Sequence, residues 1–162
     1  MISGGLFGTI LLAAIFLPPK RISIFRPNGD SSERDEIRWQ NKNSNCGPIA
    51  LKMILDYYAV PSTLLEIETR VKLNSRGATM LAMKETAERK GLHAEGWRLT
   101  LRDLANIHFP VILFVNGDHY IVADSLFGET LFARDPSFGK IEVPLTRLSD
   151  HWKGETLIFK KK

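Results

Sequence analysis

The sequence predicts an α+β domain in which N-terminal helices pack on a C-terminal antiparallel β-sheet. Between residues 47 and 92, apolar residues recur three and four positions apart, which is the spacing of helices with one buried face. After Gly91 they alternate with polar residues or form short β-branched runs, which is typical of strands. Helices followed by a series of strands indicate an α+β fold and not a doubly wound parallel sheet.

Length and composition limit the possible classes of protein. A chain of 162 residues with 44% hydrophobic and 25% charged residues is of the size and composition of one globular domain. A single cysteine excludes an intramolecular disulfide and a structural zinc site built on several thiolates, and we expect no metal and no cofactor. The net charge of +4 comes without a basic helix or an aromatic stacking surface, so we expect no nucleic-acid partner.

The first residues differ in composition from the rest. Residues 2–19 carry no charge and are followed at once by Lys20 and Arg21. We therefore expect residues 1–19 to be a hydrophobic membrane anchor or signal segment, with membrane contact through residues 2–19. Cations on the C-terminal side favour a cytoplasmic domain by the positive-inside rule. Export to the periplasm or cell surface after cleavage of a signal peptide, and a cytosolic start, stay open as alternatives.

A polar linker is expected over residues 20–36, followed by the folded domain over residues 37–162. Three helices are predicted at the start of this domain, over residues 47–58, 61–73 and 78–92. Pro48 fits a first helical turn, Ser62 or Thr63 an N-cap with Glu66 in a capping box, and Gly91 a C-terminal cap. A short helical turn over 101–107 interrupts a meander of six predicted strands, over 93–99, 109–117, 119–126, 129–136, 139–145 and 156–161.

Cys46 lies where a polar loop, "QNKNSN", turns into the first predicted helix. Many free cysteines are inert core residues. At a helix N-terminus, however, unpaired N–H groups and the helix dipole stabilise the thiolate, which is the nucleophilic form. The polar residues around Cys46 are expected to be exposed, as a nucleophile requires.

A cysteine nucleophile needs an imidazole that holds the thiol proton and protonates the leaving group. Of the four histidines, His93, His108 and His151 fall in turns or loops and are expected to be surface residues. His119 opens the strand "YIVA" after an Asn-Gly turn, so a rigid strand could fix its ring.

Two further positions complete a possible thiol-hydrolase site. Asp135 ends the strand after that of His119, so a hairpin could bring the two side by side and let the carboxylate orient the imidazole. Asp-Pro is also a common start of a turn. Gln40 could supply a side-chain N–H which, with the Cys46 backbone N–H, stabilises an oxyanion.

The chain from Trp39 to Phe159 resembles the bacteriocin-processing cysteine peptidases that cut double-glycine leaders and are often fused to export transporters. Four blocks occur in the order found in that family: "QNKNSNCGPIALKMILDYY", "RGATMLAMKETAERKGLHAEG", "FPVILFVNGDHYIVA", and "ARDPSFG" with the late "DHWKGETLIF". The sequence departs from the family in having Asn45 before the cysteine, where an acid is usual, and Asp118 before the histidine, where glycine is common.

The resemblance implies a papain-like cysteine peptidase fold, with Cys46 as nucleophile, His119 as general base and acid, Asp135 as orienting group and Gln40 as oxyanion donor. It implies a peptide or precursor-protein substrate cut after a Gly-Gly-like leader site. No ATPase segment follows in this sequence, so we expect any ABC exporter or secretion partner to be a separate chain. A catalytically silent module that docks leader peptides for export, and an acyl transferase with the same triad, are the alternatives.

Overall fold

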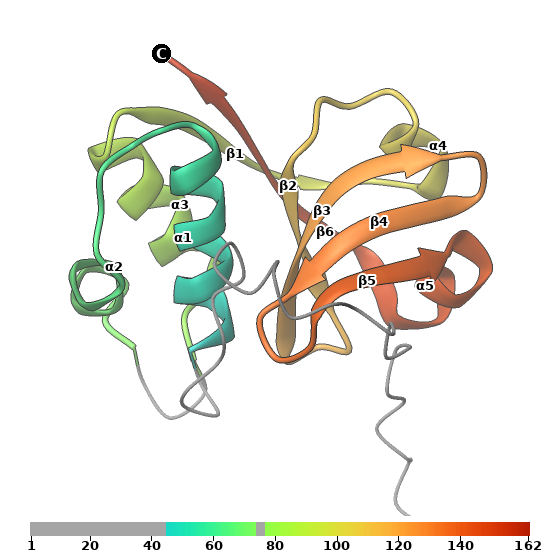
Figure 1. The fold of residues 1–162 in the computed structure, drawn as a ribbon, viewed down its shortest axis with the longest axis horizontal. Helices are drawn as coiled ribbons and strands as arrows, with labels where there is room; N and C mark the ends of the chain where they lie inside the picture. Colours follow the sequence, from blue (N-terminus) through green and yellow to red (C-terminus); the bar gives the residue numbers. More distant parts are fainter. Residues whose placement is uncertain (1–44, 74–76) are drawn as a thin grey trace, which may run out of the picture.

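The computed structural model describes residues 45–73 and 77–162. Three helices stand on one face of a six-stranded antiparallel sheet, and two short helices lie on its other side (Figure 1). This arrangement confirms the predicted α+β class. The expected anchor, the linker and Gln40 lie outside the described residues, and no helix in the described part of the chain has the length and apolar character needed to cross a bilayer.

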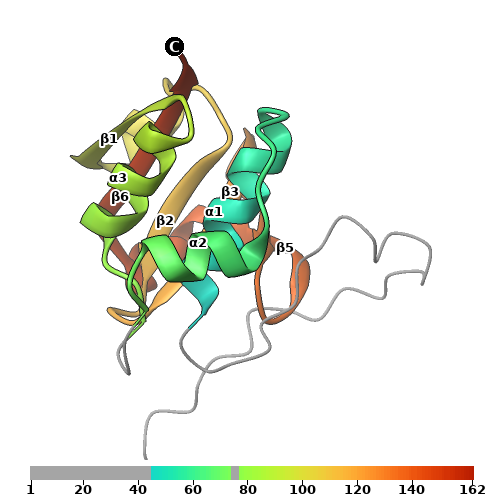
Figure 2. The same cartoon turned by 90° about the vertical axis from the view of Figure 1, so that its left-hand side faces the viewer.

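The three helices on the first face are α1 (Cys46–Tyr57), α2 (Leu64–Arg70) and α3 (Met80–Arg89). Helix α1 runs beside the sheet with α2 and α3 packed against it (Figure 2). Its residues from Cys46 to Leu55 are all buried, because the sheet covers one side and the other helices cover the rest. The predicted helical periodicity is therefore correct, but the helix is buried nearly all round.

Local signals in the sequence explain where the other helices begin and end. The side chain of Thr63 accepts a hydrogen bond from the Glu66 N–H and that of Thr79 from the Ala82 N–H, so each is an N-cap. After α3, Gly91 adopts a φ of +94°, a left-handed conformation that glycine tolerates without strain. The chain thereby reverses directly into the first strand.

The sheet has the order β1-β6-β2-β3-β4-β5. Four of its strands form the predicted meander, but the last strand inserts between β1 and β2 in place of extending the edge. An unpredicted helix, α5, carries the chain from the far edge back to this central position. The remaining elements are β1 (Leu92–Arg98), α4 (Leu101–Leu104), β2 (Val111–Val115), β3 (His119–Phe127), β4 (Thr130–Asp135), β5 (Gly139–Pro144), α5 (Leu145–His151) and β6 (Trp152–Lys161).

Two hydrophobic cores lie on opposite faces of this sheet. The first joins α1, α2 and α3 to strand residues such as Ile112, Tyr120 and Phe159. The second lies beneath α4 and α5 and contains Leu104, Leu148 and the alternate residues of β2 to β5. Because neighbouring strand residues point into different cores, the register of each strand is strongly specified.

We predict that Gly154→Ala destabilises the protein strongly. Gly154 has a φ of +101°, and a Cβ built there would lie 2.5 Å from the Leu99 carbonyl oxygen. To relieve the backbone strain and the clash of the added methyl group, β6 would have to move away from the end of β1. We expect the free energy of unfolding to fall by about 2 kcal/mol or more. Urea unfolding measures this cost. Gly96→Ala is the matched control, since its nearest neighbour would be 3.9 Å away, and equal stability of both variants would contradict the prediction.

Candidate active site

Cys46 is the first residue of α1, as the sequence predicts. The first helical hydrogen bond runs from the Ile49 N–H to the Asn45 carbonyl at 3.1 Å, and Pro48 has no N–H to donate. Among the described residues, the N–H groups of Cys46 and Gly47 have no hydrogen-bond acceptor. Two backbone donors are therefore left at the helix end that carries the sulfur.

The expected exposure is wrong for Cys46 and for Asn45, the one polar residue before it that the structure describes. Cys46 is only 5% exposed, and Asn45, Gly47 and Pro48 are buried with it. The reason is the central place of α1, whose first turn is enclosed by β3, α2 and α3. The nucleophile candidate is therefore a buried residue.

His119 is the first residue of β3 and follows a tight turn. Asn116 and Gly117 both have positive φ values, +57° and +74°, and Val115 and His119 face each other in the antiparallel pair. Asn-Gly is a favoured pair for such turns because both residues tolerate this conformation. The imidazole is thus carried by a rigid strand end, as predicted, and its side chain is 20% exposed.

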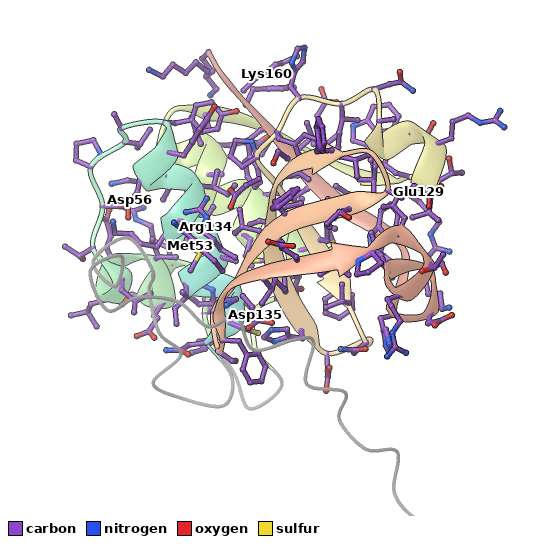
Figure 3. All side chains as sticks on the ribbon, turned by 45° about the vertical axis from the view of Figure 1, so that its right-hand side comes forward. Met53, Asp56, Glu129, Arg134, Asp135 and Lys160 are labelled. Carbon is purple, nitrogen blue, oxygen red and sulfur yellow. The ribbon has the colours of Figure 1, made fainter. Side chains whose placement is uncertain are left out.

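Asp135 is the last residue of β4 and lies beside His119, because the two strands are antiparallel neighbours. Its Oδ2 is 3.0 Å from the Nε2 of His119, and its Oδ1 accepts the Ser137 N–H at 2.7 Å. Both carboxylate oxygens are thus occupied, and the side chain is only 3% exposed. The hairpin brings the predicted pair together. Figure 3 shows Asp135 at the end of the molecule where α1 begins.

The His119 ring interacts with Cys46 as well as with Asp135. Burial of the ring by itself lowers the imidazole pKa, but hydrogen bonds to Asp135 and Cys46, and the negative charges of both groups, raise that pKa to about 10. With Nε2 on the carboxylate, Nδ1 is the atom left for the sulfur. The raised pKa keeps the His119 imidazole protonated at neutral pH, so this ring can donate a proton to a leaving group.

The positions of Cys46 and His119 are linked by the residues that follow them. A Cβ added to Gly47 would lie 3.3 Å from the Tyr120 ring, 3.1 Å from the Ala78 Cβ and 2.9 Å from the Met83 Sδ. Tyr120 is itself fixed, because its hydroxyl donates to the Ala78 carbonyl at 3.0 Å. Only a glycine lets α1 approach β3 this closely. Burial and the nearby Cys46 raise the pKa of Tyr120 to about 12, so this phenol keeps its proton.

The other three histidines have different partners and settings. His93 lies in β1 and pairs with Glu95, and His151 ends α5 and pairs with Asn116, so the turn positions expected for these two are wrong. His108 is exposed in a loop, as expected. Sequence reasoning missed Gly47, Tyr120 and the Ser137 N–H. The "DPSFG" turn could have suggested Ser137, because a side chain that begins a turn often accepts the N–H two residues later. The described residues hold no group of three or more His, Cys, Asp or Glu that could bind a metal.

Residues 34–162 match the model of the peptidase C39 family. The chain belongs to this family. The matched region contains Cys46, His119 and Asp135 and every described helix and strand.

Relatives and solved structures agree with this membership. The chain is 29% identical to the probable functional amyloid protease FapD of Pseudomonas aeruginosa, over 71% of this chain and 56% of that protein. It is 25% identical to the lactococcin-G-processing and transport ATP-binding protein LagD of Lactococcus lactis, over 78% of this chain but only 19% of that protein.

Among crystal structures, the double glycine motif protease of an AMS/PCAT transporter, solved with its leader peptide, aligns with a TM-score of 0.75 at 27% identity, covering 78% of this chain and 91% of that one. The peptidase domain of Streptococcus ComA aligns with a TM-score of 0.73 at 20% identity, covering 78% and 98% of the two chains. The latter likeness shows the fold alone. Together these matches confirm the papain-like C39 fold and the resemblance stated from the sequence.

The raised His119 pKa predicts how the stability of this C39 domain depends on pH. A protonated imidazole that is favoured in the folded state stabilises it fully below the unfolded pKa of about 6.5, and this contribution is lost as pH rises to about 10. The difference in free energy of unfolding between wild type and His119→Gln should therefore shrink across this range. Urea titrations at each pH measure it, and a constant difference would contradict the prediction.

We predict that Gly47→Ala slows alkylation of Cys46 by iodoacetamide and costs about 1 to 3 kcal/mol of stability, the usual penalty for overpacking. The added methyl group pushes α1 away from β3 and separates the sulfur from the imidazole. Adding Met83→Ala removes the nearest contact, at 2.9 Å, and should restore part of the rate. Met83→Ala alone is the control. An unchanged rate in Gly47→Ala would show that this contact does not position the sulfur.

Proposed function

We propose that this protein is a cysteine endopeptidase that cuts a peptide or protein precursor after a small-residue, Gly-Gly-like leader site. The observations that carry the proposal are the contact of His119 with Asp135 at 3.0 Å and the effect of Cys46, which raises the pKa of the same imidazole. These three residue types in this order form the machinery of papain-like thiol hydrolysis. Membership of the peptidase C39 family supports the same chemistry.

In the first half of the proposed reaction, the Cys46 thiolate attacks the carbonyl carbon before the scissile bond. The negative charge passes to the carbonyl oxygen, where the Cys46 N–H at the start of α1 is placed to stabilise it. We assign a second donor role to Gln40. The protonated His119 gives its proton to the nitrogen of the leaving amine, the C–N bond breaks, and a thioester with Cys46 forms.

In the second half, neutral His119 takes a proton from water, and the resulting hydroxide attacks the thioester carbonyl. The C–S bond breaks, the carboxylic acid leaves, and the Cys46 thiolate and the His119 imidazolium are restored. Asp135 stays in contact with the His119 ring throughout. It fixes the plane of the ring through Nε2, while the Ser137 N–H prevents the carboxylate from rotating away.

The burial of Cys46, which is only 5% exposed, supports a substrate with little side-chain bulk at the scissile bond. Glycine pairs meet this requirement. The crystal structure of a related protease that binds a leader peptide, at 27% identity, favours the same class. The likeness to a probable functional amyloid protease supports protein precursors, as well as peptides, as substrates.

We also propose that the peptidase works beside a separate exporter or secretion system, as an anchored domain facing the cytoplasm. The likeness to one part of LagD, whose name describes both processing and transport, supports this association. Fractionation of cells that produce the full chain, followed by protease protection of intact and opened cells, tests the location. Digestion of the domain in intact cells would place it outside.

We predict that Cys46→Ala abolishes cleavage of synthetic precursor peptides that contain a Gly-Gly site, while the variant keeps the wild-type circular dichroism spectrum. The sulfur is the nucleophile, and alanine leaves none. Cleavage is followed by mass spectrometry of the two products. Full activity of the variant, or binding of the peptide by wild type without any cut, would contradict the proposal.

Gln40→Ala should lower kcat on the order of a hundredfold, as expected when one oxyanion donor is lost.

Asp135→Asn should be damaging, although it is nearly isosteric. The carboxylate accepts from both His119 and the Ser137 N–H, whereas an amide has one acceptor oxygen and must lose one of these bonds. We expect kcat to fall by about tenfold or more, as for a lost bond to a charged group. The alkaline limb of the pH profile should also move to lower pH, because the charge that raises the His119 pKa is removed. A variant with the wild-type rate and profile would contradict the role of Asp135.

A further inference from the structure

The residue before the nucleophile makes a contact outside the reaction described so far. Asn45 is completely buried and occupies the N-cap position of α1. Its side chain does not accept an N–H of the first helical turn. Its Nδ2 instead donates to the Oε1 of Glu68 on α2, at 3.1 Å.

This orientation is unusual for an asparagine at a helix start. Asparagine is among the preferred N-cap residues because its side-chain oxygen accepts the N–H two or three residues later. The third helical position here is Pro48, which has no N–H, so the side chain could cap only the Gly47 N–H. In the observed orientation, that donor and the Cys46 N–H keep no acceptor among the described residues.

Glu68 makes this contact with Asn45, whereas Glu66, another acid on α2, bonds to other residues. Glu66 bonds to Lys90 at 3.1 Å and to Arg70 at 3.2 Å, so it belongs to the α2–α3 side. Glu68 lies against α1, where α2 packs through the buried Ile67. The α1–α2 packing therefore brings one carboxylate to the residue that precedes the nucleophile.

We propose that Glu68 is a positioning residue for Cys46. By holding the Asn45 carboxamide toward α2, it keeps the N-terminus of α1 uncapped, so that the Cys46 and Gly47 N–H groups are available to the sulfur anion and to the oxyanion. A capped helix end would give the Gly47 N–H to Asn45 and weaken the stabilisation of negative charge there. This inference rests on the proposed thiol chemistry of Cys46.

The test uses the full chain and measures the rate of Cys46 alkylation by iodoacetamide at pH 6, together with kcat and KM for a Gly-Gly precursor peptide. Glu68→Ala removes the acceptor of the Asn45 Nδ2, so that the carboxamide can turn toward the helix end and cap it. We expect the alkylation rate and kcat to fall roughly five- to tenfold, about the worth of one hydrogen bond, with KM unchanged. Alanine is a good helix former, so α2 itself should persist.

Two matched variants separate this role from charge and from general stability. Glu68→Gln keeps an oxygen that accepts from Asn45 and should retain the wild-type rates. Glu66→Ala removes the same charge from the same helix and breaks its bonds to Lys90 and Arg70, yet should leave alkylation unchanged. Asn45→Gly can neither reach Glu68 nor cap the helix, so it should alkylate faster than Glu68→Ala.

The inference is overturned if Glu68→Ala alkylates like wild type, if Glu68→Gln falls as far as Glu68→Ala, or if Asn45→Gly is as slow as Glu68→Ala. Failure of the proposed function looks different. If wild type cuts no precursor peptide, the peptidase proposal fails, while the alkylation series still tests how Glu68 and Asn45 act on the sulfur.

Discussion

The chemistry of this protein depends on the close packing of Gly47 in α1 against Tyr120 in β3. Each of these residues directly follows a member of the Cys46 and His119 pair, so the register between helix and strand is also the register between sulfur and imidazole. The contact is fixed on both sides, by Met83 and Ala78 behind Gly47 and by the Tyr120 hydrogen bond to Ala78. Two elements far apart in the chain thereby act as one rigid support.

Asp135, the third residue of the candidate site, is positioned by strand pairing within the sheet. Asp135 reaches His119 because β3 and β4 are joined in an antiparallel pair whose register places the end of one beside the beginning of the other. In the turn after Asp135, the Ser137 N–H donates to the other oxygen of this carboxylate. The imidazole is therefore oriented by a strand, a neighbouring strand end and a turn, none of which needs a bound ligand to take its place.

Local patterns predicted most of the elements, and the places of Cys46, His119 and Asp135 at the ends of those elements, because each is encoded over a few neighbouring positions. Threonine caps, the Gly91 reversal and the Asn116–Gly117 turn all lie where their residue types indicate. The order of the strands could not be predicted in this way, because the insertion of β6 between β1 and β2 depends on pairing across the whole domain. The burial of Cys46 was missed for the same reason, because the polar loop before it says nothing of the sheet and helices that enclose α1. The bond from Asn45 to Glu68, 23 residues away, has no local signal.

The central claim is that the Cys46 sulfur becomes covalently attached to the substrate. The most direct measurement is intact-mass spectrometry of wild-type protein quenched in acid during cleavage of a Gly-Gly precursor peptide, followed by peptide mapping. The account predicts a transient adduct equal to the leader fragment less one water, located on Cys46. Cleavage that proceeds with no adduct, or with the adduct on any other residue, would contradict it.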